Sequence, residues 1–240
     1  MSVFEQNVVS AIAIGLIIAV MAYIKNSHLK ALVYSLPIPI TIALIATGGK
    51  VNTTNIVGLF LLTLFLWFVW LLNEQGVNIF VADVVAAFSY VLVGYVAIQH
   101  IKIPFYLGVF IYFVIWICFV TLYRNRVAIE KKKQDPKINP GIKGVIVTIL
   151  AYLLLSLKTY LSGIIVTFPF SGVFAVIEGK HILETLASVF SRNSIAILMM
   201  FITIYGLEKI NLGLKISAGW IVYLIILKLV IKFIPFNKAI

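Results

Sequence analysis

The feature that most constrains this chain is a series of apolar runs, most of them long enough to cross a lipid bilayer as a helix. A spanning helix needs about 20 mostly apolar residues. Nine runs approach or meet that length: 7–24, 29–48, 54–72, 78–98, 103–123, 143–157, 160–178, 186–206 and 214–234. The chain is 62% hydrophobic and 11% charged, whereas soluble domains are roughly 45–50% apolar and about 25% charged. The sequence therefore predicts an all-α fold, a polytopic membrane helical bundle with about nine transmembrane helices.

One basic loop divides the chain into two halves. Residues 124–143 carry seven Lys or Arg, so 125–142 is predicted to be a solvated, cytoplasmic linker. It separates a first membrane domain, 1–124, which holds one repeat and a linking fifth helix, from a second membrane domain, 143–240.

Basic residues also predict the orientation. With nine crossings, thirteen Lys and Arg fall on one side of the membrane and five on the other. Since Lys and Arg are enriched in cytoplasmic loops, the N-terminus is predicted outside and the C-terminus inside. The net charge of +11 is then explained by loops that face anionic lipid, and we expect no binding to nucleic acid.

Two proline-containing segments, 32–48 and 164–180, look like copies of each other. When they are aligned, Pro37 falls on Pro169, and apolar residues match apolar residues through most of the rest. The repeats that contain these segments use spans one to three and spans six to eight. Because an offset of five spans is odd, the copies cross the membrane in opposite senses, which predicts two inverted-topology repeats.

Proline removes a backbone donor and interrupts a helix, so Pro37 and Pro169 should each free backbone carbonyls inside the membrane. Four hydroxyl residues stand close enough in the sequence to satisfy them: Ser35, Thr41, Thr167 and Ser171. One interpretation is that the two breaks face each other near the middle of the membrane, where these six residues line a substrate cavity. The other is that they are ordinary proline kinks that shape helix packing.

Ionisable residues inside a span are costly and are candidates for a function. Arg192, beside Asn193, falls within the eighth predicted span and could bind an anionic group of a solute. Alternatively, that span begins near Asn193 and 180–192 forms a surface helix, so that Arg192 reaches the interface. Asp83 and Glu178 lie near the cytoplasmic ends of their predicted spans. One interpretation is that they carry a coupling proton or ion, and the other is that they are solvated residues at the membrane interface.

The two segments resemble the GlpM-like family of small bacterial inner-membrane proteins. The family's stretch has a short Lys-Thr/Asn linker, a proline, and then Phe-Ala-Leu-Ile-Ala. The matching residues are Ile-Lys-Asn-Ser (24–27), Pro37 and Ile-Ala-Leu-Ile-Ala (42–46) in the first copy, and Leu-Lys-Thr-Tyr (157–160), Pro169 and Phe-Ala-Val-Ile-Glu (174–178) in the second. The resemblance covers 20–72 and 152–205, which implies a double-length relative. It implies an inner-membrane location and a suggested link to polysaccharide production, while drug/metabolite transporters offer a broader fold-level likeness.

The sequence carries no Walker motif, nucleophile elbow, Cys/His cluster or dinucleotide fingerprint. We therefore expect no enzyme activity, no cofactor and no bound metal. The predicted function is a permease, driven by an ion gradient or by its solute's own gradient, for a small solute that is anionic if Arg192 lines the cavity. The alternative is a non-transporting subunit that scaffolds a cell-envelope or polysaccharide assembly. The expected partners are the lipid bilayer, the solute, and either further copies of the chain or envelope proteins.

Overall fold

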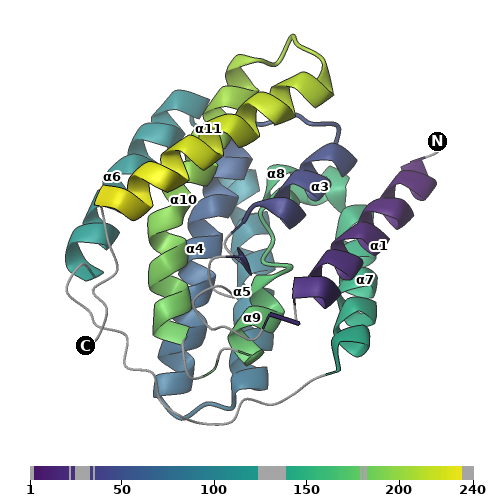
Figure 1. The fold of residues 1–240 in the computed structure, drawn as a ribbon, viewed down its shortest axis with the longest axis vertical. Coiled ribbons are helices and arrows are strands. Elements are labelled where there is room, and N and C mark those ends of the chain that lie inside the picture. Colours follow the sequence, from purple (N-terminus) through teal and green to yellow (C-terminus); the bar gives the residue numbers. More distant parts are fainter. Residues whose placement is uncertain are drawn as a thin grey trace.

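The computed structural model describes residues 3–21, 23–24, 33–34, 36–123, 139–178, 180 and 183–233. Every element in these ranges is a helix (Figure 1): α1 (Val3–Met21), α3 (Ile38–Ala46), α4 (Thr53–Glu74), α5 (Ile79–His100), α6 (Phe105–Tyr123), α7 (Pro140–Ser156), α8 (Lys158–Val166), α9 (Gly172–Glu178), α10 (Leu183–Gly206) and α11 (Leu212–Phe233). The predicted linker lies outside the described residues, except for its last few, where α7 begins.

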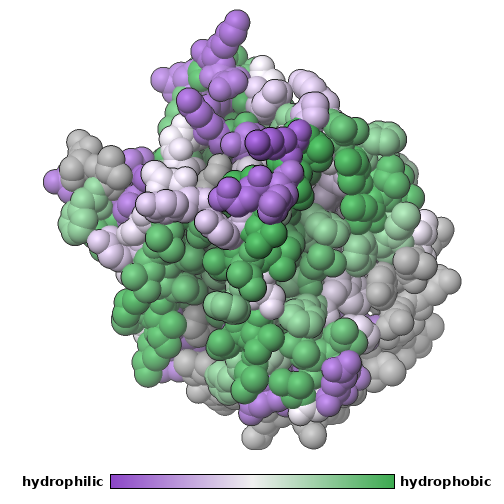
Figure 2. Space-filling view, turned by 180° about the vertical axis from the view of Figure 1, so that it is seen from behind, coloured by the Kyte–Doolittle hydropathy of each residue, from purple (hydrophilic) through white to green (hydrophobic). Residues whose placement is uncertain are grey.

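Five helices in the described ranges are long and apolar enough to cross a membrane: α1, α4, α5, α10 and α11. Two apolar stretches of 10–17 residues, Phe105–Thr121 and Pro140–Ser156, are shorter. Figure 2 shows a face of the bundle on which hydrophobic residues cover the middle and hydrophilic residues gather toward the top. The prediction of an all-α membrane bundle is confirmed at this level, whereas the nine crossings and the inverted repeat stay predictions.

The two segments that contain the aligned prolines are the places where the helices are short. Pro37 immediately precedes α3, which runs for 9 residues. In the second segment, 167–171 is not helical and separates α8, of 9 residues, from α9, of 7. At about 1.5 Å of rise per residue, none of these pieces exceeds roughly 14 Å, about half of a bilayer's hydrocarbon core.

Helices α4 and α10 lie side by side at the centre of the bundle, and their neighbours are arranged around them (Figure 1). Helix α5 packs on α4, α11 packs on α10, and α6 contacts both central helices. Among the described helices, the most extensive contact is the one between α1 and α7. The short helices α8 and α9 each contact both α4 and α5, and α8 also contacts α3 and α7.

Glycines permit the closest approaches between helices. A Cβ atom added to Gly15 of α1 would meet the Oγ1 atom of Thr148 in α7 and, at 2.6 Å, the carbonyl oxygen of Gly144. On α4, a Cβ atom at Gly58 would meet the Oγ1 atom of Thr167 and, at 3.2 Å, the Cα atom of Ile164. Small residues at such crossings let backbones come together inside a membrane, where packing rather than a hydrophobic driving force holds helices in place.

Gly58→Ala should destabilise the protein by about 1–3 kcal/mol, because the added methyl group has no room between α4 and the end of α8. Gly206→Ala is the matched control, since nothing lies within 4 Å of a Cβ atom there. Denaturation of the purified protein in detergent measures both. Equal stability of the two variants would contradict the close contact between α4 and α8.

Candidate functional site

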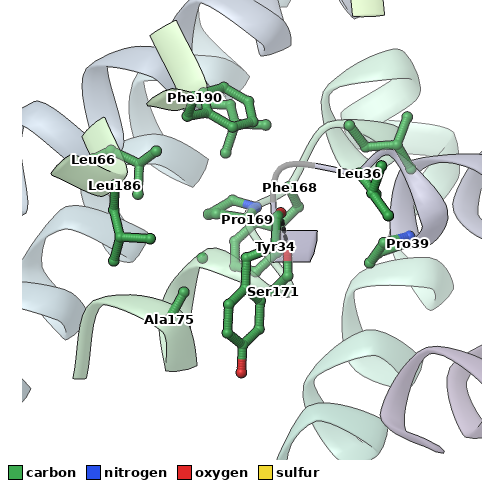
Figure 3. A pocket seen from close by; sticks show the side chains of 13 residues that line it. Tyr34, Leu36, Pro39, Leu66, Phe168, Pro169, Ser171, Ala175, Leu186 and Phe190 are labelled. Carbon is green, nitrogen blue, oxygen red and sulfur yellow. Dashed lines mark hydrogen bonds between the residues drawn. The ribbon is translucent and has the colours of Figure 1, made fainter. Parts of the chain in front are cut away.

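A pocket lies between the two proline-broken segments and contains about 520 Å³ of empty space, its open mouth included. The first segment contributes Tyr34, Leu36, Pro39 and Ile40, and the second contributes Phe168, Pro169, Ser171, Gly172 and Ala175. Helices α4 and α10 complete the wall with Leu62, Leu66, Leu186 and Phe190. Figure 3 shows these side chains converging from both halves of the chain.

One hydrogen bond joins the two segments directly. The hydroxyl group of Ser171 donates to the backbone carbonyl oxygen of Tyr34 at 3.4 Å (Figure 3). Ser171 therefore ties the non-helical stretch after α8 to the backbone just before α3. In an apolar environment such a carbonyl needs a donor, which makes this serine a structural tie as well as part of the pocket wall.

The pocket wall is mostly apolar. Of the thirteen lining residues that the structure describes, only Tyr34 and Ser171 carry a polar side chain, and none carries a charge. Aliphatic and aromatic groups bind uncharged, apolar molecules, while one or two hydroxyl groups fix their orientation. This described part of the wall suits a neutral or weakly amphipathic molecule and holds no charge to bind an anion.

The second break is held from outside the pocket by Tyr90 of α5. Its hydroxyl group donates to the carbonyl oxygen of Ile164 at 2.9 Å and lies 2.9 Å from the Oγ1 atom of Thr167. The ring of Tyr90 also meets the ring of Phe168 edge-on, with centroids 5.5 Å apart. Thr167 is fully buried in this contact, so it satisfies the broken backbone, as expected, but does not line the pocket.

The first break is held in a comparable way by Thr41. Its hydroxyl group donates to the carbonyl oxygen of Pro37 at 2.7 Å, one turn back. The Oγ1 atom of Thr41 in turn accepts a hydrogen bond from the indole nitrogen of Trp220 in α11 at 3.0 Å. Thr41 and Pro37 therefore anchor the start of α3 and lie outside the pocket wall.

Arg192 lies within α10, which runs unbroken from Leu183 to Gly206. Where along this helix the membrane begins, and so whether Arg192 lies inside the span or at the interface, stays a prediction. The Nε atom of Arg192 donates to the carbonyl oxygen of Ser188 at 3.4 Å, and its own carbonyl accepts from the indole of Trp116 at 3.2 Å. Arg192 is not among the pocket-lining residues.

Asn193 is buried beside two buried serines, Ser191 and Ser194. The hydroxyl group of Ser191 accepts a hydrogen bond from the indole nitrogen of Trp67 in α4 at 2.9 Å. These three polar side chains of α10 are thus covered by protein. They belong to the region where α10 packs on α4 and α6.

The remaining predicted residues stand apart from the pocket. Asp83 is buried on α5, with 2% of its surface exposed, and not solvated at an interface. Ser35 and the side chain of Glu178 lie outside the described residues. In the described ranges, no group of three or more His, Cys, Asp and Glu residues could hold a metal ion.

Of the predicted substrate-binding residues, the structure brings Pro169 and Ser171 to the pocket. Sequence reasoning missed most of the wall, including Tyr34, Phe168 and Phe190. These side chains give no local signal, since apolar residues occur throughout the chain. The proximity of Tyr34 to the second proline depends on long-range packing.

No protein-family model matches the chain, and it matches no curated protein and no solved structure. The resemblance to the GlpM-like family therefore stays a prediction.

Tyr90→Phe should lower stability by about 1–3 kcal/mol, because it removes the hydroxyl group that bonds to the backbone carbonyl of Ile164 and to the side-chain hydroxyl of Thr167. Tyr95→Phe on the same helix is the matched control, since Tyr95 is 44% exposed. Thermal unfolding in detergent compares the two. If both variants melt like the unsubstituted protein, Tyr90 does not anchor the second break.

Proposed function

We propose that this protein is a membrane permease for a small, uncharged and largely apolar solute, which binds between the two proline-broken segments. One observation carries the proposal: a single pocket takes wall residues from both segments, which lie far apart in the chain and in different halves of it. In transporters built from repeats, the solute site lies where discontinuous helices of the two repeats meet. The absence of charge from the described wall argues against an anionic solute.

The packing of the helices supports an inverted repeat of nine crossings. If α1 corresponds to α7, α4 to α10 and α5 to α11, contacts of α1 with α7 and of α4 with α10 are those of helices that lie beside a two-fold axis, and both contacts are present. The same axis relates the α4–α5 contact to the α10–α11 contact. In Figure 1, α4 and α10 run in opposite directions, as inversion requires. The two broken segments would supply the crossings that no single long helix makes.

A second candidate, a scaffold subunit of an envelope or polysaccharide assembly, is favoured by the apolar wall itself. A permease needs a path that opens to water, whereas a scaffold can close the space between its halves with apolar side chains. The resemblance to the GlpM-like family supports this candidate and an inner-membrane location. Access to the pocket from water separates the two functions.

Single cysteines placed in the turns should show the proposed orientation. We expect Lys50→Cys and Lys209→Cys to react with a membrane-impermeant maleimide applied to intact cells, and Gln75→Cys to react only after permeabilisation. All three residues are exposed, and they lie on opposite predicted sides of the membrane. Each change is made with Cys118→Ser, since Cys118 is an exposed free cysteine. The reverse labelling pattern would contradict the orientation.

Ser171→Cys and Ala175→Cys should react with a small, water-soluble thiol reagent in membrane vesicles, because both residues line the pocket. Leu59→Cys is the control, since Leu59 is fully buried outside the wall and should stay unreactive. Mass spectrometry gives the labelled fraction. If neither pocket cysteine reacts from either side, the pocket is closed to water and the scaffold function is favoured.

A further inference from the structure

Asp83 stands out among the buried polar residues. Within the part of the chain that the structure describes, its Oδ1 atom is the one buried side-chain oxygen or nitrogen with no hydrogen-bond partner. The residue is 2% exposed and lies one turn into α5, a helix long and apolar enough to cross a membrane. A carboxylate charge in such surroundings is expensive, and binding of a proton removes that charge.

The buried face of α5 follows the second broken segment along its length. This face carries Gly94, Tyr90 and, two turns or about 10 Å further on, Asp83. A Cβ atom at Gly94 would meet the side chain of Ile164 at 2.9 Å, and Tyr90 bonds to Ile164 and contacts Thr167. Helix α5 also packs on α9, the helix that begins at Gly172 in the pocket wall. Asp83 is seven residues from Tyr90, which places it two turns away on the same buried face of α5.

We propose that Asp83 is the proton-binding site of this protein and that its protonation controls the position of α9. This inference rests on the proposed permease function and names its coupling ion. The carboxylate takes up a proton from one aqueous side and releases it to the other. The neutral acid is compatible with the packed α5–α9 contact. The charged form favours a state in which α9 separates from α5, water reaches Asp83, and the pocket wall at Gly172 and Ala175 moves.

Few other titratable groups on the helices packed against α5 could change protonation over the same pH range. Among the described helices, those that pack most extensively on α5 are α4, α8 and α9. Their titratable residues are Glu74 at the exposed end of α4, Lys158 and Tyr160 at the start of α8, and Glu178 at the end of α9. Lys158 is bound to Asn7 and to the carbonyl oxygen of Ala46, both at 3.0 Å. Glu178 is the acid nearest along α9 to the proposed contact, so Glu178→Gln is included in the test.

Infrared difference spectroscopy of the purified full chain across a pH step measures the protonation directly. We expect a carboxylic-acid band in the unsubstituted protein and in Glu208→Gln, whose carboxyl group is exposed in the α10–α11 turn. Asp83→Asn should lose this band, and Glu178→Gln should keep it. Asparagine has the shape of the neutral acid, so Asp83→Asn should fold. If the band survives in Asp83→Asn, Asp83 is not the proton site.

A second measurement links the proton to the pocket. In the Cys118→Ser background, the labelling rate of Ser171→Cys in vesicles should change severalfold between low and high pH. With Asp83→Asn added, the rate should stay at the low-pH value. If labelling occurs but its pH dependence persists with Asp83→Asn or is absent throughout, the proton proposal is overturned and the permease proposal stands. If Ser171→Cys never reacts, the permease proposal fails, while the infrared band still decides whether Asp83 binds a proton.

Discussion

In an apolar environment, every backbone carbonyl needs a hydrogen-bond donor, and the two breaks at the centre of this bundle are held by side-chain donors in addition to those of the backbone. The carbonyl oxygen of Pro37 accepts both the backbone N–H and the hydroxyl group of Thr41. The carbonyl oxygen of Ile164 accepts the backbone N–H of Thr167 and the hydroxyl group of Tyr90. Ser171 serves the carbonyl of Tyr34 and thereby joins the two breaks. Because each donor comes from a defined position, the breaks are fixed features of the fold, and the pocket between them has a defined wall.

Much of the fold could be predicted from the sequence, because apolar runs of membrane length and proline interruptions are local signals. The predicted spans at 54–72 and 78–98 differ from α4 and α5 by one or two residues at each end. The pocket could be predicted only in outline. Hydroxyl residues near a proline can point to the backbone, to another helix or into a cavity, and the sequence does not distinguish these outcomes. The hydroxyl group of Thr167 contacts that of Tyr90. Ser171 donates a hydrogen bond to the first broken segment and also lines the pocket.

Charge proved the least informative signal for the pocket itself. Arg192 and Asp83 both lie in apolar helices, yet neither belongs to the pocket wall. A position within a span gives a residue's depth but not its direction around the helix, and direction decides what the side chain meets. The described wall is apolar, and these two ionisable residues are not part of it. In the proposed mechanism, solute recognition and proton binding are therefore separate tasks: the broken segments bind the solute, and α5 binds the proton.

The contact between α1 and α7 has a consequence for how the two halves could move. Each is the first described helix of its half, and they meet through Gly15 and Gly144 with little side-chain volume between the backbones. Smooth surfaces in close contact can rotate against each other without first disengaging long side chains. This pair is therefore suited to be a pivot at one edge of the bundle, about which the two halves could rotate.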